Sequence, residues 1–234
     1  IKNCDLAEKS PVLIARKRRD GIWNVYEKSR KSTTKAKSIW TETQFINEQG
    51  TIELGKIGMG DVFSHPKPVA LLRQCVFLTT GLNDIIMDFF AGSGTAAHAT
   101  MSQNAVDGGS RRSILVQLPE TLDPTNLEQK NASDFCDQLS KQRTIAELTK
   151  ERLRRAGKKI REENPIFAGD LGFRVFKLAS SNIQEWEAGP TSLTESLQTS
   201  IDHLKADRSE QDILFELLLK LGLDLTVAIE SRVI

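Results

Sequence analysis

The clearest hydrophobic pattern in the chain begins near Pro66. Val69, Leu72, Cys75 and Val76 share one helical stripe, with a proline in the first turn and a glycine near the end. This spacing predicts a helix over about residues 67–79. Residues 1–62 show little clean periodicity and are expected to form loop and short strands.

A second pattern predicts a parallel sheet. The run IIMDFF at residues 85–90 is short, apolar at every position but one and bounded by turn residues, as is typical of a strand buried on both faces. The glycine loop AGSG follows at once, then a helical segment TAAHATMSQ, then a second apolar run at 112–118. This order is that of a strand–helix–strand crossover, so we expect an α/β fold.

The rest of the chain is predicted to be mainly helical. Residues 131–162 have the length and charge content of one long helix or two. Residues 173–178 alternate like a strand, and amphipathic helices are expected at about 192–205 and 209–221.

Composition excludes several classes of protein. No stretch reaches the roughly 20 apolar residues of a membrane-spanning helix, and the first residues lack a signal-peptide core. We therefore expect a soluble, cytoplasmic protein with no membrane partner. Cys4, Cys75 and Cys136 lie far apart with no Cys/His cluster, which argues against a disulfide framework and against a metal site.

The charges are unevenly distributed. Residues 1–37 hold eleven Lys/Arg against four Asp/Glu, whereas residues 185–234 hold four against ten. The basic end, with Trp23 and Tyr26 between its cations, could track DNA phosphates, although a solvated loop explains it too. The cations singled out are Arg16, Lys17, Arg18, Arg19, Lys28, Arg30 and Lys31.

The glycine loop carries the candidate chemistry. Gly92, Gly94 and Ala97 satisfy a dinucleotide-binding fingerprint, which leaves a nicotinamide-dependent oxidoreductase open, with Glu120 near the expected ribose position. Asp88, four residues before the first glycine, favours another ligand. A pyrophosphate has no use for a carboxylate there, but a ligand carrying an ammonium group does.

The motif from Asp88 to Thr95 resembles the DxFxGSGT signature of amino-methyltransferases, and Phe63 to Pro68 resembles the motif that precedes it in the β-class, permuted order. With segments 114–120, 172–186 and 214–230, the chain resembles the modification subunit of type III restriction-modification systems. The resemblance implies an S-adenosylmethionine-dependent DNA adenine-N6 methyltransferase. The implied cofactor residues are His65, Lys67, Asp88, Phe90, Ala91, Gly92, Ser93, Gly94 and Thr95, with Gln117 or Glu120 at the ribose.

The catalytic (D/N)PPY tetrapeptide of that family is absent, because the prolines stand at 11, 66, 68, 119, 124, 165 and 190. We therefore expect an incomplete Rossmann-like methyltransferase sheet, inactive alone, that is part of a longer protein. The expected domains are a basic segment at 1–62, a cofactor-binding part at 63–180 and an acidic, helical or α+β appendage at 181–234.

The resemblance also implies partners, namely double-stranded DNA, a second modification subunit and a restriction subunit. A non-catalytic module that only binds and assembles remains the main alternative. The helical leucine stripe at 214, 217, 218 and 221 is more typical of a core than of an interface.

Overall fold

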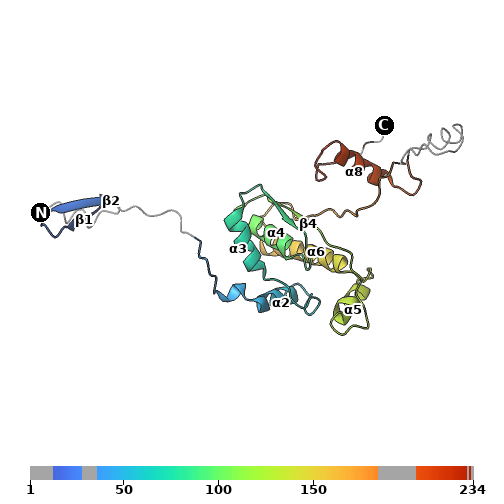
Figure 1. Cartoon of the computed structure of the whole chain (residues 1–234), viewed down its shortest axis with the longest axis horizontal. Helices are drawn as coiled ribbons and strands as arrows, with labels where there is room; N and C mark the ends of the chain where they lie inside the picture. Colours follow the sequence, from blue (N-terminus) through green and yellow to red (C-terminus); the bar gives the residue numbers. More distant parts are fainter. Residues whose placement is uncertain (1–12, 28–35, 184–203, 231, 233–234) are drawn as a thin grey trace, which may run out of the picture. The chain divides into compact units, whose positions relative to one another are not determined.

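The computed structural model describes residues 13–27, 36–183, 204–230 and 232 and has an α/β architecture (Figure 1). The chain divides into two compact units, Ile1–Leu171 and Gly172–Ile234. None of the helices in the described ranges is long and apolar enough to cross a membrane.

The strand–helix–strand crossover predicted from the sequence is confirmed. Strand β3 (Ile85–Asp88) pairs in parallel with β4 (Arg112–Leu115), and helix α4 (Thr95–Asp107) connects them. Two further hydrogen bonds continue the pairing into the loops, from Val116 N to Asp88 O and from Ala91 N to Val116 O. The crossover therefore places the glycine loop at the carboxyl ends of the two strands.

The expectation that this strand is buried on both faces is wrong for the described residues. Ile85, Met87, Ile114 and Val116 are 43% to 51% exposed, although Ile86 and Asp88 between them are half-buried. Among the described residues this sheet has two strands, and the face that carries these four side chains is partly open to solvent.

Helix α4 is the most buried helix of the first unit. It contacts α3 (Val69–Thr79), α6 (Ile145–Glu163) and both strands. Its small residues, among them Ala96, Ala97 and Ala99, allow these close approaches. Gly94 and Gly108 flank the helix in the left-handed conformation, which glycine adopts without strain.

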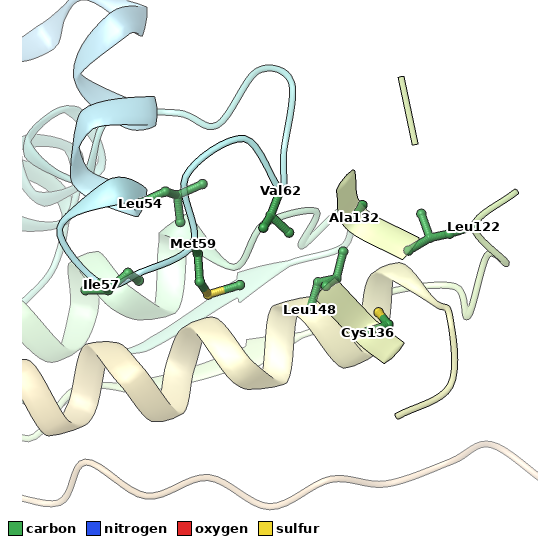
Figure 2. Packing of buried hydrophobic residues seen from close by; sticks show 8 residues of the cluster. All are labelled: Leu54, Ile57, Met59, Val62, Leu122, Ala132, Cys136 and Leu148. Atoms are coloured by element: carbon green, nitrogen blue, oxygen red, sulfur yellow. The ribbon is translucent and has the colours of Figure 1, made fainter. Parts of the chain in front are cut away.

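A hydrophobic core joins elements that are distant in the sequence. Figure 2 shows this core, which brings α2 (Asn47–Gly55) and the loop after it against α5 (Lys130–Gln138) and α6. Its members are Leu54, Ile57, Met59, Val62, Leu122, Ala132, Cys136 and Leu148. The segment predicted as one helix or two is therefore two helices, and Cys136 is a buried thiol in this core.

The expectation of loop and short strands for residues 1–62 is correct only in part. Strand β1 (Leu13–Lys17) and strand β2 (Trp23–Glu27) form an antiparallel hairpin in which Gly21 has a φ of 81°. However, a short 3-10 helix, η1 (Thr43–Phe45), and helix α2 follow it. Helix α2 was not predicted from the sequence, because two of its nine residues are glycines and its stability comes from packing on the core.

In the second unit, helix α8 (Glu210–Lys220) confirms the last predicted helix, and Ser209 and Asp212 form its capping box. The strand predicted at 173–178 is wrong. That segment has no strand ladder and is held by its side chains instead: Arg174 donates to the carbonyl oxygens of Leu225 and Val227, and Phe176 packs edge-on against Phe215. The helix predicted at 192–205 falls almost wholly outside the described residues.

Candidate cofactor pocket and comparisons with known proteins

A cavity of about 230 Å³ lies at the carboxyl end of β3, where the glycine loop meets the segment before α3. Its lining contains most of the residues predicted from the sequence. The lining residues are His65, Lys67, Leu72, Asp88, Phe90, Ala91, Gly92, Ser93, Thr95 and Ala96. Gly94, Gln117 and Glu120 lie outside the lining, and Leu72 and Ala96 were not predicted.

The glycine loop is fixed by its own backbone and by α6. Gly92 and Gly94 have φ values of 49° and 76°, and the Gly94 N–H donates to Ala91 O over 2.6 Å. A Cβ added at Gly94 would lie 2.9 Å from the Thr149 Cγ2 atom on α6. Glycine is therefore required at 94 both by conformation and by the neighbouring helix.

The acidic residue of the motif faces the cavity from the strand end. Asp88 Oδ1 accepts the Phe90 N–H over 3.0 Å, which holds the carboxylate beside the loop. The second oxygen, Oδ2, accepts no hydrogen bond from the described residues. A ligand ammonium group could therefore bind there.

Helix α6 supports the loop from behind, which the sequence did not reveal. Thr149 Oγ1 donates to Gly92 O over 2.5 Å. Arg152, fully buried, donates through Nη1 to Ser93 Oγ over 2.5 Å, to Thr95 Oγ1 over 2.8 Å and to Ser93 O over 3.2 Å. Three-residue spacing places both side chains on one face of α6, but that spacing alone names no target.

The segment before α3 forms one wall of the cavity, and helix α2 packs against this segment. A Cβ added at Gly50 would lie only 2.0 Å from the Pro66 carbonyl oxygen, so the two backbones are in close contact. Glu53 Oε2 accepts the Val69 N–H over 2.6 Å and thereby caps α3. Thr95 Oγ1 donates to Lys67 O over 3.4 Å, which links this wall to the glycine loop.

The two candidates for the ribose contact differ in their surroundings. Gln117 Oε1 accepts the Gly92 N–H over 2.8 Å, so this side chain supports the loop. The Glu120 side chain is exposed, and its carbonyl oxygen accepts the Ile145 N–H over 3.2 Å. A ribose contact by either residue stays a prediction.

Two buried bases lie behind the loop. Burial lowers the pKa of Arg152 to about 10, and Glu53 opposes this shift, so the guanidinium remains charged at neutral pH. Burial, reinforced by the positive charges of Arg152 and Lys159, lowers the pKa of His98 to about 3. His98 is therefore neutral at physiological pH.

The cavity fits the amino-acid end of a ligand. It offers a carboxylate at Asp88, an exposed ammonium at Lys67 and a hydroxyl at Ser93, which suit a group bearing both charges. A Cβ added at Gly92 would meet only Phe90 O, at 3.7 Å, so a ligand can approach the backbone there.

The candidate DNA-binding cations divide into two groups. Arg16, Lys17, Arg18 and Arg19 are exposed on β1 and the hairpin turn, and Arg18 forms an ion pair with Asp20 at 3.4 Å. Lys28, Arg30 and Lys31 lie outside the described residues.

Comparisons with known proteins agree with the motifs. Residues 8–106 match the N6_N4_Mtase model, described as a DNA methylase. The chain is 36% identical over 138 residues to the StyLTI Mod subunit of a type III restriction-modification enzyme from Salmonella typhimurium. It is 34% identical over 157 residues to the EcoPI Mod subunit from Escherichia phage P1.

The chain is therefore similar in sequence to type III modification subunits. The resemblance indicated by its motifs is thereby confirmed. These matches cover 59% and 65% of the chain but only 20% and 23% of the two modification subunits. The chain is also 35% identical over 97 residues to the type II methyltransferase M.KpnI from Klebsiella pneumoniae, 42% of the chain and 23% of that enzyme.

Proposed function

We propose that this chain binds S-adenosylmethionine and forms the methyl-donor part of a type III DNA adenine-N6 methyltransferase that works in a prokaryotic cytoplasm. The observation that carries the proposal is the single cavity that unites Asp88, Lys67 and the glycine loop. The likeness to DNA methylases and to type III modification subunits supports the same reaction.

Bound S-adenosylmethionine would supply the sulfonium methyl group for transfer. The chain's residues would bind and orient it: Asp88 would accept the ligand ammonium group, and Gly92 would let its backbone approach the ligand. Gln117 would keep the loop in this conformation, and Phe90, 88% exposed, could pack against the ligand's apolar parts.

We propose further that β3 and β4 belong to a larger, Rossmann-like methyltransferase sheet. Parallel sheets are covered on both faces, yet the outer residues of these strands are about half exposed. Strands from the remainder of a modification subunit would pair with the strand edges, and its helices would cover this face.

The base-binding side of the reaction would also come from other parts of such a subunit. The catalytic (D/N)PPY tetrapeptide is absent from these 234 residues. It would accept hydrogen bonds from the adenine amino group and stack against the extruded base. A second candidate function is a module that binds cofactor and partners without catalysis. Both candidates share the cofactor pocket.

Calorimetric titration of the full chain with S-adenosylmethionine tests the pocket. We expect saturable binding that Asp88→Ala weakens at least about tenfold, since a charged hydrogen bond is lost. Asp84→Ala is the matched control, because Asp84 caps the opposite end of β3 by accepting the Gly81 N–H over 2.8 Å. Binding of NADH in place of S-adenosylmethionine would support an oxidoreductase and overturn the proposal.

We also propose that the basic hairpin contacts DNA phosphates, since its cations are exposed on one short element. Replacing Arg16, Lys17 and Arg19 by alanine should reduce the slope of log affinity against log salt by about three, roughly one per phosphate contact. Lys158, Lys159 and Arg161 form the control set, because two of them pair with Glu162 and Glu163 on α6. Equal effects from both sets would contradict a specific role for the hairpin.

The second unit is our candidate for subunit contacts, either with a second modification subunit or with a restriction subunit. Helix α8 has no buried residue, and Leu217, Leu219 and Leu221 are 46% to 72% exposed. Sedimentation of the full chain should show a dimer that Leu219→Lys weakens. A monomer at all concentrations would leave the restriction subunit as the partner to test.

A further inference from the structure

The guanidinium of Arg152 determines how the hydroxyl groups behind the glycine loop share their protons. Arginine can only donate hydrogen bonds. Because Nη1 lies within 2.8 Å of both Ser93 Oγ and Thr95 Oγ1, both hydroxyl oxygens must act as acceptors toward it. Each hydroxyl therefore keeps its own proton for donation to a third group.

The two protons have different acceptors available. The Thr95 hydroxyl donates to Lys67 O. The Ser93 hydroxyl has Thr95 Oγ1 at 3.0 Å, and Ser93 also lines the cavity. Rotation of this hydroxyl toward a ligand would sacrifice only one hydroxyl–hydroxyl hydrogen bond, so Ser93 is poised to donate into the cavity.

The charge behind Ser93 favours an anion as the acceptor. Arg152 forms no ion pair within 4 Å in the described part of the chain, and its Nε and Nη2 atoms are buried without hydrogen-bond partners. Glu53 is the carboxylate that acts on it electrostatically, and it already accepts the Val69 N–H. Because Glu53 compensates the charge of Arg152 only weakly, the guanidinium produces a positive electrostatic potential at the two hydroxyl groups.

We propose that Arg152 is a positioning residue that holds the Ser93 hydroxyl as a hydrogen-bond donor and gives the pocket its selectivity for a ligand carboxylate. The inference rests on the proposed function, since the carboxylate is that of S-adenosylmethionine. Asp88 would then bind the ammonium group of the same amino-acid end, and Ser93 with Arg152 behind it would bind the carboxylate.

Decarboxylated S-adenosylmethionine, which lacks only the carboxylate, separates this role from a merely structural one. Calorimetric affinities of both ligands are measured for the wild-type chain and for Arg152→Gln, Ser93→Ala and Arg155→Gln. We expect Arg152→Gln and Ser93→Ala to weaken S-adenosylmethionine about tenfold, the effect of losing one hydrogen bond to a charged group, and to weaken the decarboxylated ligand less than about threefold.

Arg155→Gln is the matched control. Arg155 lies on the same helix and donates to Ile57 O and Gly58 O, away from the loop. It should change neither affinity selectively. Ser93→Ala keeps the buried arginine and decides the question if Arg152→Gln does not fold.

The possible outcomes are distinct. Selective loss of the carboxylate-bearing ligand supports the assignment. Equal loss of both ligands in Arg152→Gln and Ser93→Ala means that the arginine only maintains the loop, which overturns it. A folded wild-type chain that binds neither ligand would refute the proposed cofactor and, with it, the role proposed for Arg152.

Discussion

Of helices α4 and α8, the more polar one is buried and the more hydrophobic one is exposed. Helix α4, with the sequence TAAHATMSQNAVD, is built from small and polar residues, yet nine of its thirteen residues are buried. Helix α8, with the sequence EQDILFELLLK, is rich in leucine and has no buried residue. The difference follows from their neighbours, since α4 contacts two helices and two strands within the first unit.

The packing of α4 explains why the glycine loop that precedes it is held in one position. A helix that packs against several neighbours holds its first turn in one position, and the loop before it is therefore also held in place. In the second unit, α8 is held by its cap, by Phe215 against Phe176, and by Glu216, which accepts hydrogen bonds from Ser181 and Asn182. Its exposed leucines would suit the subunit contact proposed for the second unit.

The largest expected effect comes from truncating one apolar side chain in each helix. Met101→Ala on α4 should lower the free energy of unfolding by about 3 kcal/mol, because it leaves a cavity in a packed core. Leu219→Ala on α8, at a position that is 60% exposed, should cost less than about 1 kcal/mol. Hydrogen exchange at the amides of each helix measures both, and equal costs would contradict the comparison.

A smaller effect is expected from the glycines that flank the two helices. Gly94→Ala would combine a φ of 76° with a close approach to Thr149, and should cost about 2 to 3 kcal/mol. Gly222→Ala, after α8, has a φ of 69° but no atom within 4 Å of the added Cβ, so only the conformational cost of about 1 kcal/mol applies. Urea denaturation of the two variants should rank them in this order, and the reverse order would refute the contact with α6.

The two helices should also respond differently to acid. The pKa of His98 on α4 lies at about 3 in the folded chain, below its usual 6.5, so the unfolded chain binds a proton first. Above pH 6.5 His98 is neutral in both the folded and the unfolded chain, so it does not lower the free energy of unfolding. Below pH 6.5 the free energy of unfolding should fall by up to about 1.4 kcal/mol per pH unit. Urea denaturation between pH 7.5 and 5 should show this decline, and His98→Gln should remove it.

Helix α8 should keep its stability to lower pH. Hydrogen bonds from Lys220, Ser181 and Asn182 lower the pKa of Glu216 from 4.5 to about 2. The contribution of this carboxylate is therefore complete above pH 4.5 and is lost as the pH falls toward 2. Amide exchange at pH 5.5 should detect loosening in α4 but not in α8, and loosening in α8 at that pH would contradict the assignment.

The sequence was sufficient for the parts whose structure is local. The strand, glycine loop, helix and second strand were predictable because residues 85–118 combine an apolar run, turn residues and a helical pattern in one short stretch. Asp88 and the loop residues could be assigned to a pocket because the carboxyl end of β3 places them there.

The parts that depend on distant contacts could not be predicted. Helix α2 forms because Gly50 and Leu54 pack against other segments, although its sequence has weak helical propensity. Arg152 belongs to a run of charges that is typical of a solvated helix face, and only the fold places it under Ser93, 59 residues earlier. The strand predicted at 173–178 failed because alternation in a sequence supplies no neighbouring strand to pair with.

The central claim is that the loop before α4 binds S-adenosylmethionine. The most direct test is peptide-resolved hydrogen exchange of the full chain with and without this ligand. The account predicts slower exchange in residues 88–97 and in the first turn of α3, with no change in α8. Unchanged exchange in residues 88–97 at saturating ligand, or protection confined to the second unit, would contradict it.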